Sequence, residues 1–466
     1  MGSLTSLLNL AQQSLLADQS ALNVTSNNVA NQNTAGYTRE VVSWQPSDAV
    51  TLSGTLFNGG ITTTAASQRD RVLEQRMHQQ TQAQAQSGAL ESALQQVENI
   101  FGLSATATSA SSTALGTAMD SFFSSLSALT ANPSDAATRQ SVLSAANALA
   151  SSFNSASNQI TQIASGINQQ ISSAVGQINE LTATIASLNQ QIGSVSPDKD
   201  AGVLEDQRQQ AIAQLSQYIG LDQISTENNG ISLTMSNGAV LVSGNQSFAL
   251  QTTPVAASIH LFDTTGQDVT AGIVGGQVAA LIQVRDRNLP DYMSALDSLA
   301  SAIGTQVNQQ NALGLDGNGN PGGALVTLPA SASGAAAAIA VATNDPKAIA
   351  AASVGEGSAG SGNAQALADL ATSVIVGGET ASGYYAALLG QIGSDASEAA
   401  TDNSAQQAAL AQLTTQRNSL SGVSLDEEAA NLTQYQRSYE AAAKMFTIAD
   451  RLTADALNLG VQSAVS

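Results

Sequence analysis

The sequence contains no cysteine, and it is poor in charged and aromatic residues. Charged residues make up 11% and aromatic residues 3% of the 466 positions. The lack of cysteine excludes disulfides, thiolate catalysis and zinc–thiolate sites. Only two histidines occur, His78 and His260, so the commonest general base and metal ligand of enzymes is almost missing. We therefore expect no catalytic residues, no metal site and no cofactor.

Basic residues are scarce too. The chain has 14 Lys and Arg against 35 Asp and Glu, a formal net charge of -21 and a pI near 4.1. Binding to nucleic acid requires basic residues that displace counterions, and anionic membranes repel an acidic chain. No apolar run approaches the length of a membrane span. The N-terminus also lacks the basic region of a secretory signal, because the first cation is Arg39. We expect neither a nucleic-acid partner nor a membrane partner.

The N-terminal segment has the pattern of a long amphipathic helix that ends in an Asn-rich turn. Asn27, Asn28, Asn31 and Asn33 precede Gly36 and Tyr37, and Asn and Gly tolerate the left-handed backbone conformations that end helices. Steps of four and three residues, with two polar interruptions, predict a heptad seam before this turn. The seam positions are Leu4, Leu8, Ala11, Leu15, Asp18, Leu22, Thr25 and Val29.

A second stripe lies near the C-terminus. It follows the acidic run Asp426–Glu428, whose charges suit the positive end of a helix dipole. Neither terminal helix can bury its stripe alone, so we expect helices over about residues 4–30 and 425–459 to lie side by side. The stripe consists of Leu432, Tyr435, Tyr439, Ala442, Phe446, Ala449, Ala456 and Leu459.

The interior of the chain combines a long helix with an inserted β segment. Apolar residues recur at steps of three and four from Phe153 to Ile192, which predicts one long helix in a bundle. Residues 222–273 change to strand alternation with tight Asn-Gly turns, typical of a small β domain. Two short strands, at residues 37–42 and 59–64, are expected to form a hairpin near the N-terminal helix.

These patterns define the expected fold class as mainly α with inserted β (α+β). It has long terminal coiled-coil helices, a discontinuous helical-bundle body and a small inserted β domain. Residues 1–60 and 422–466 are assigned to the terminal domain with its short hairpin. Residues 61–217 and 275–421 are assigned to the body, and residues 218–274 to the β domain.

Two short motifs resemble ligand sites only formally. Residues 355–360 fit a dinucleotide fingerprint, but they lie in a low-complexity segment rather than between a buried strand and a helix. Residues 316–321 resemble the start of a calcium loop, yet Pro321 and Thr327 occupy the places of the required Gly and Glu. A flexible loop and a tight polar turn explain the two motifs better.

The two chain ends resemble a known group of proteins. Residues 21–39, with the Asn-rich turn, resemble the N-terminal signature of the bacterial flagellar axial proteins, which are the rod, hook and hook-associated subunits. Residues 422–432, 435–441 and 448–452 resemble the C-terminus of the hook-associated protein 1 family. The run from Asp426 to Asn431 favours this family over rod and hook subunits, which usually lack it.

This resemblance implies a structural role and no enzymatic activity. Members of the family leave the cell through the flagellar type III system without a cleaved signal, polymerise at the hook tip and form the junction between hook and filament, which filament assembly and motility need. The implied location is therefore extracellular, in the flagellum. The alternatives are another rod or hook subunit, or a coiled-coil surface adhesin.

The resemblance also implies partners and assembly residues. The implied partners are hook protein, the second hook–filament junction protein, further copies of the chain, and a cytoplasmic export chaperone that binds the C-terminal helix. The residues expected to serve assembly lie on the two seams and in the Asn-rich turn. They are Leu8, Leu15, Leu22, Asn27, Asn28, Asn31, Asn33, Gly36, Tyr37, Leu432, Tyr435, Tyr439 and Phe446.

Overall fold

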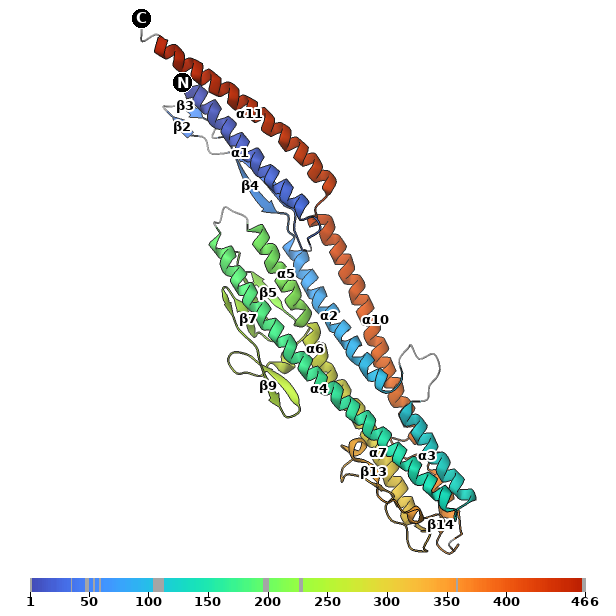
Figure 1. The fold of residues 1–466 in the computed structure, drawn as a ribbon. Coiled ribbons are helices and arrows are strands. Elements are labelled where there is room, and N and C mark those ends of the chain that lie inside the picture. The colour runs from blue at the N-terminus through green and yellow to red at the C-terminus, as the bar shows by residue number, and fades with distance from the viewer. Residues whose placement is uncertain are drawn as a thin grey trace.

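The computed structural model shows an elongated protein built from long helices (Figure 1). It describes residues 2–34, 36–46, 50–52, 55–57, 60–103, 113–195, 201–225, 229–357 and 359–462. Small sheets are attached to the helices, which confirms the predicted class of a mainly α fold with inserted β. None of the helices in these ranges is long and apolar enough to cross a membrane.

The two ends of the chain form one pair of helices. Helix α1 (Gly2–Ala30) and helix α11 (Leu425–Gln462) lie side by side at one end of the molecule (Figure 1), as predicted. Small side chains dominate the buried positions of the two helices, and on α1 some of these also pack against the strands that follow. The fully buried side chains of α1 are Ala11, Ala17, Asp18, Ala21, Val24, Thr25 and Asn28.

The predicted seams needed correction at several positions. On α1, Val29 is exposed rather than buried. On α11, Tyr439 and Phe446 are 40% and 36% exposed, while Ala442 and Ala449 are buried as expected. Because an Ala-lined contact is narrow, the large side chains beside it stay at the surface. Leu459 belongs to a segment whose side chains lie outside the described part.

A hairpin packs against the terminal helices. Strand β1 (Glu40–Pro46) pairs antiparallel with β4 (Ile61–Ser67) in an unbroken register from Glu40 opposite Ser67 to Pro46 opposite Ile61. The predicted strands at residues 37–42 and 59–64 thus begin a few residues later, and residue 59 lies outside the described part. Between them, β2 (Val50–Leu52) pairs with β3 (Thr55–Phe57). The hairpin spans the domain limit predicted at residue 60.

The body is organised along helix α4 (Ala136–Ser194), which at 1.5 Å per residue is about 90 Å long. Asp135 begins this helix by accepting a hydrogen bond from the Thr138 N–H. The predicted stripe is buried at Phe153, Ile160, Ile167 and most later positions, and it belongs to the main hydrophobic core.

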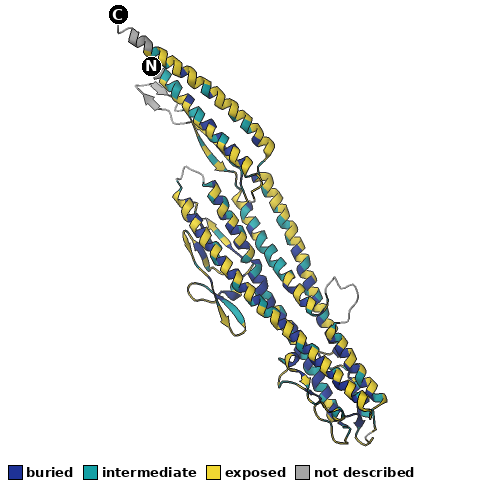
Figure 2. Ribbon diagram, viewed as in Figure 1, coloured by how far each residue is buried: buried dark blue, intermediate teal, exposed yellow. Residues whose placement is uncertain are grey.

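The other helices of the body pack along α4 and each other. Helices α2 and α10 form a second long pair that continues from the terminal pair (Figure 1). Burial is concentrated in this body, whereas the terminal pair is mostly exposed (Figure 2). The helices are α2 (Arg71–Ile100), α3 (Ala114–Ala131), α5 (Gly202–Tyr218), α6 (Gly276–Gln283), α7 (Leu289–Ala312), α8 (Ala335–Ala338), α9 (Gly362–Asp369) and α10 (Ala381–Ser421), with the short helical turns η1 (Thr270–Gly272), η2 (Val284–Asn288) and η3 (Pro346–Ala348).

The inserted β segment is fastened to α4 by asparagine amides. Asn179 donates to the Leu250 carbonyl and accepts from the Leu250 N–H, at 2.9 and 2.8 Å. Asn189 forms the same kind of pair with Ile231. Each amide therefore pairs with both backbone groups of one residue, at the start of β6 for Ile231 and just before β9 for Leu250. The strands are β5 (Asp222–Ser225), β6 (Ile231–Thr234), β7 (Val240–Ser243) and β8 (Gln246–Ser247), which form one sheet in that order, and the pair β9 (Gln251–Val255) and β10 (Ser258–Phe262).

Two further small sheets lie at the end of the body far from the termini. One sheet connects the segments on either side of residues 316–351, and the other lies within that stretch. They are β11 (Gly314–Leu315) with β14 (Ala352–Ser353) and β12 (Val326–Thr327) with β13 (Ala340–Val341).

Candidate assembly site

The side chain of Asn28 organises the Asn-rich turn. It is 1% exposed, and its amide nitrogen donates to the Glu40 carbonyl at 2.9 Å. Its Oδ1 accepts from the Glu40 N–H at 3.0 Å and from the Tyr37 hydroxyl at 2.9 Å. A single amide therefore connects the end of α1, the turn and the first residue of β1.

Gly36 allows the chain to reverse at this point. Its φ is +83°, in the region that side chains with a Cβ seldom adopt. Its carbonyl, and that of Tyr37, accept hydrogen bonds from Nη2 of Arg417 on α10, at 2.7 and 2.8 Å. The turn is thereby held against the last part of the body helix α10.

The next residues connect the turn to three other segments. The Thr38 N–H donates to Oδ2 of Asp206 on α5 at 3.1 Å. The Arg39 N–H donates to the Ser421 carbonyl at 2.9 Å, and the Arg39 guanidinium pairs with Glu427 and Glu428 on α11. Residues 36–39 thus lie where the terminal pair meets the body.

Electrostatics keep the Tyr37 hydroxyl protonated. Burial raises the pKa of Tyr37, and the negative charges of Glu40, Asp206 and Glu428 raise it further. The hydroxyl therefore remains a hydrogen-bond donor to Asn28 across the physiological range. This arrangement fixes a backbone conformation and offers no activated group for chemistry.

The outer faces of the terminal pair expose large apolar side chains. Exposed apolar surface of this kind, on helices that are mostly uncovered (Figure 2), is typical of an interaction site. The exposed fractions reach 58% at Leu16, 57% at Ile448 and 55% at Leu457. On α1 and α11 the set comprises Leu10, Leu16, Val29, Leu425, Tyr439, Met445, Phe446, Ile448, Leu452 and Leu457; Val41 and Trp44 of strand β1 are exposed as well.

Apart from Tyr439 and Phe446, which are exposed on α11, the residues expected to serve assembly divide into three structural groups. Asn28 and Tyr37 are brought together in the turn, beside Gly36. The leucines Leu8, Leu15, Leu22 and Leu432 are half-buried at the edge of the helix pair, as is Tyr435. Asn27 and Asn33 are exposed, and Asn31 donates to the Asn27 carbonyl within the turn. Whether these residues serve assembly stays a prediction.

Sequence reasoning missed the charged residues that fix the turn. Sequence patterns mark Arg39 only as the first cation, and Glu427 and Glu428 only as charges at a helix start. Arg417, Ser421 and Asp206 carried no local signal, because each meets the turn across more than a hundred positions. The only sequence feature that points to these contacts is the scarcity of basic residues, which leaves each arginine isolated among many carboxylates.

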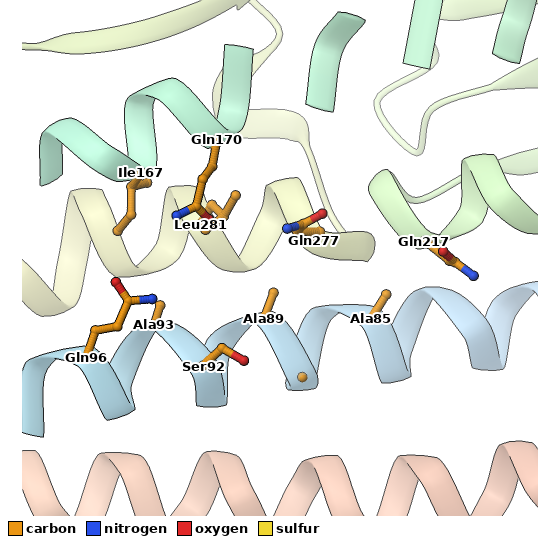
Figure 3. Close-up of a pocket in the computed structure, with 11 residues that line it drawn as sticks. Ala85, Ala89, Ser92, Ala93, Gln96, Ile167, Gln170, Gln217, Gln277 and Leu281 are labelled. Carbon is orange, nitrogen blue, oxygen red and sulfur yellow. The ribbon is translucent and has the colours of Figure 1, made fainter. Parts of the chain in front are cut away.

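One cavity in the described part of the body is lined by uncharged side chains only. This cavity of about 300 Å³ lies between α2, α4, α5 and α6 (Figure 3). Its lining consists of Ala, Gly, Ser, Gln, Ile and Leu side chains, and none of these titrates. Within the described residues no group of three His, Asp or Glu side chains could hold a metal ion.

The two formal ligand motifs behave as local structure. Oδ1 of Asp316 accepts hydrogen bonds from the Asn318 and Asn320 N–H groups, both at 2.8 Å, which is the predicted polar turn. Glu356 accepts from the Ser353 and Gly362 N–H groups in the other motif. Ser358, inside that motif, lies outside the described part.

Family models match three parts of the chain. The model described as flagellar hook-associated protein FlgK helical domain matches residues 94–326, which is half of the chain. The flagella basal body rod protein model matches residues 8–38, across the Asn-rich turn. The flagellar basal body rod FlgEFG protein C-terminal model matches residues 415–459, across α11.

Individual relatives agree with the family models. Flagellar hook-associated protein 1 of Escherichia coli is 27% identical over 68% of this chain, and the match spans 59% of that protein. Its counterpart in Salmonella typhimurium is 27% identical over 98% of this chain and 100% of that protein. The solved flagellar hook junction protein FlgK from Burkholderia pseudomallei shares the fold, with a TM-score of 0.66 and 21% identity over 74% of this chain and 100% of that one.

The parts matched by the family models coincide with the structural units that the site joins. The two rod-type models cover α1 with its turn and α11, and the helical-domain model covers much of the body. The chain belongs to the family of flagellar hook-associated protein 1.

Proposed function

We propose that the protein is a structural subunit of the hook–filament junction, which polymerises at the hook tip through its terminal helix pair. The observation that carries this proposal is the exposed apolar surface of α1 and α11. Large side chains such as Leu16 and Ile448 remain more than half exposed in the single chain. Burying each of them is worth about 1.5–3 kcal/mol, which favours association with neighbouring subunits.

The expected neighbours are hook protein, the second junction protein and further copies of this chain. The rod-type models at both ends support the contact with an axial assembly. A cytoplasmic chaperone is expected to cover the exposed face of α11 before export by the flagellar type III system. This places the mature protein outside the cell, in the flagellum. A coiled-coil adhesin is disfavoured because it would not need matched signatures at its two ends.

Leu15→Asp tests the proposal. Leu15 is half-buried at the edge of the pair, so the carboxylate leaves the body folded but puts a charge into the surface that assembly would bury. We expect cells with hooks but no filaments, which release flagellin into the medium. The control is Gln19→Asp, an exposed position one turn further along the same helix, which should leave motility unchanged.

Circular dichroism of the purified variant separates assembly from folding. Native helicity together with the loss of filaments supports the proposal. Normal swimming by Leu15→Asp cells, with the variant present at the hook tip, would exclude a role of this edge in assembly.

A further inference from the structure

A buried ionic cluster lies between the body and the terminal pair. It consists of Arg69, Glu74, Glu205, Asp206 and Arg208. The Arg69 side chain, just before α2, is only 4% exposed and forms a close ion pair with Asp206. Its Nε lies 3.5 Å from a Glu74 oxygen, and its Nη1 lies 3.5 Å from a Glu205 oxygen.

Several buried polar atoms of this cluster make no hydrogen bond. They are the donors Nε and Nη1 of Arg69, the donor Nε of Arg208 and the acceptor Oε2 of Glu74. Buried polar groups are nearly always hydrogen-bonded. At 3.5 Å the ion pairs of Arg69 with Glu74 and Glu205 are longer than hydrogen bonds, so the Nε and Nη1 donors still need an acceptor, which a water molecule can supply.

A small cavity adjoins these atoms. Its volume is about 40 Å³, and it is lined by Arg69, Glu74, Glu205 and Arg208 together with Gln223 and Ile231 of the β segment. One water molecule needs about 10–15 Å³ of such cavity volume. The cavity therefore has room for a few water molecules and no larger ligand.

The chemistry of the lining selects water over an ion. An anion would satisfy the arginine donors, but it would face the carboxylates of Glu74 and Glu205. A cation would leave those donors without acceptors. Water accepts from the guanidinium groups and donates to Oε2 of Glu74, so it satisfies both kinds of group.

The cluster is also connected to the terminal pair. Asp206 holds Arg69 with one carboxylate oxygen and accepts the Thr38 N–H with the other, at 3.1 Å. Thr38 is 1% exposed and directly follows the turn ordered by Asn28. Any displacement of Asp206 therefore displaces the turn from which the terminal helices emerge.

We propose that this cavity binds ordered water molecules and that the hydrated cluster is the joint that fixes the terminal pair relative to the body. Water completes the hydrogen bonds of Arg69, Glu74 and Arg208, and Asp206 transmits their position to Thr38. The joint is a property of the single chain and does not depend on the proposed assembly function.

The charges around the joint agree with this arrangement. Burial raises the pKa of Glu74 and of Asp206, and the positive charge of Arg69 opposes the rise at both. Arg417 of α10 faces the same two carboxylates. Burial lowers the pKa of Arg208 to about 10. Water in the cavity reduces the cost of keeping these groups charged.

Crystals of the full chain test the hydration. We expect electron density for water within hydrogen-bond distance of Arg69 Nε and Glu74 Oε2. Direct hydrogen bonds between Arg69 and Glu74 with no density in the cavity would overturn the assignment. An anomalous bromide peak in the cavity, in crystals grown with sodium bromide, would overturn it in favour of an anion.

Distance measurements by electron spin resonance test the joint. The chain has no cysteine, so labels attach only at the introduced pair Gln19→Cys on α1 and Gln190→Cys on α4, both exposed. Asp206→Asn keeps the size of the side chain but removes the charge that Arg69 holds. We expect the distance distribution to shift and broaden in this variant.

The matched control is Asp286→Asn, which breaks an ion pair with Arg285 elsewhere on the body. Its distribution should equal that of the parent. An unchanged distribution in Asp206→Asn, or the same broadening in both variants, would mean that the cluster does not set the orientation of the terminal pair.

Discussion

The carboxylate of Glu428 lies 2.7 Å from Nε of Arg39, although the two residues are 389 positions apart in the chain. The Glu428 side chain is only 2% exposed. Glu427, which binds the same guanidinium at 2.6 Å, is 61% exposed. One cation therefore connects the segment after the Asn-rich turn to the first turn of α11 through a buried and an exposed ion pair.

Removal of Arg39 should weaken the terminal unit strongly. Arg39→Met leaves Glu428 buried without a counter-charge, which costs about 3–5 kcal/mol. The ring centroid of Trp44, the single tryptophan, lies 6.0 Å from that of Tyr435 on α11. Its fluorescence therefore reports unfolding of this unit. We expect the fluorescence transition of the variant to move to much lower denaturant concentration.

Two further variants separate the buried pair from the exposed one. The double variant Arg39→Met with Glu428→Leu removes both buried charges and should recover most of the loss. Glu427→Gln should cost at most about 1 kcal/mol, because exposed ion pairs contribute little. Equal losses for Glu427→Gln and Arg39→Met would contradict this assignment.

Asn28→Ala should destabilise the Asn-rich turn. The substitution removes the partner of the Glu40 N–H and carbonyl and of the Tyr37 hydroxyl. Buried groups left unpaired cost about 1–3 kcal/mol. The same Trp44 transition measures the loss, and Asn33→Ala, at an exposed position of the turn, is the control. A loss no larger than that of the control would show that the amide of Asn28 is dispensable.

Asn179→Ala should loosen the β segment without unfolding α4. The variant leaves the buried N–H and carbonyl of Leu250 without their partner. We expect the Leu250 amide to exchange its hydrogen faster, through local opening. Asn147→Ala is the control, because within the described residues that amide donates to the Leu143 carbonyl of its own helix and not to the β segment. An unchanged exchange rate at Leu250 would show that the Asn179 amide does not hold the β segment on α4.

Stability should depend on His78 at mildly acidic pH. Burial lowers the pKa of His78 below its usual 6.5, while the hydrogen bond with Gln209 opposes the shift. Below pH 6.5 the unfolded chain binds a proton that the folded chain resists, so stability falls as the pH falls. The loss is at most about 1.4 kcal/mol per pH unit, and it ends once the pH falls below the lowered pKa of the folded state.

Urea unfolding at several pH values measures this effect. His78→Gln should lose this component of the pH dependence, whereas His260→Gln, at a partly exposed ring paired with Asp268, should retain it. The difference between the parent and His78→Gln isolates the histidine from the carboxylates that titrate in the same range. Parallel curves for the parent and His78→Gln would refute the prediction.

Local patterns in the sequence were sufficient for the two terminal helices, for the apolar stripe of α4 and for the inserted β segment. The steps of three and four from Phe153 to Ile192 predicted α4, and strand alternation predicted the β segment at residues 218–274. Periodicity is a local property of the chain, so it can be read without knowledge of the partner. For the same reason the pattern could not distinguish buried from half-buried seam positions such as Ala11 and Leu15.

The sequence by itself determined the fold class, the two terminal helices and the turn at Gly36, because each follows from residue types within a few turns of chain. Only the tertiary structure decided which distant polar groups pair. Arg39 donates to Glu428, and the Thr38 N–H donates to Asp206, across separations that no local pattern records. Ion pairs and buried hydrogen bonds depend on distances of a few ångströms, and these distances exist only once α5, α10 and α11 have packed around the turn.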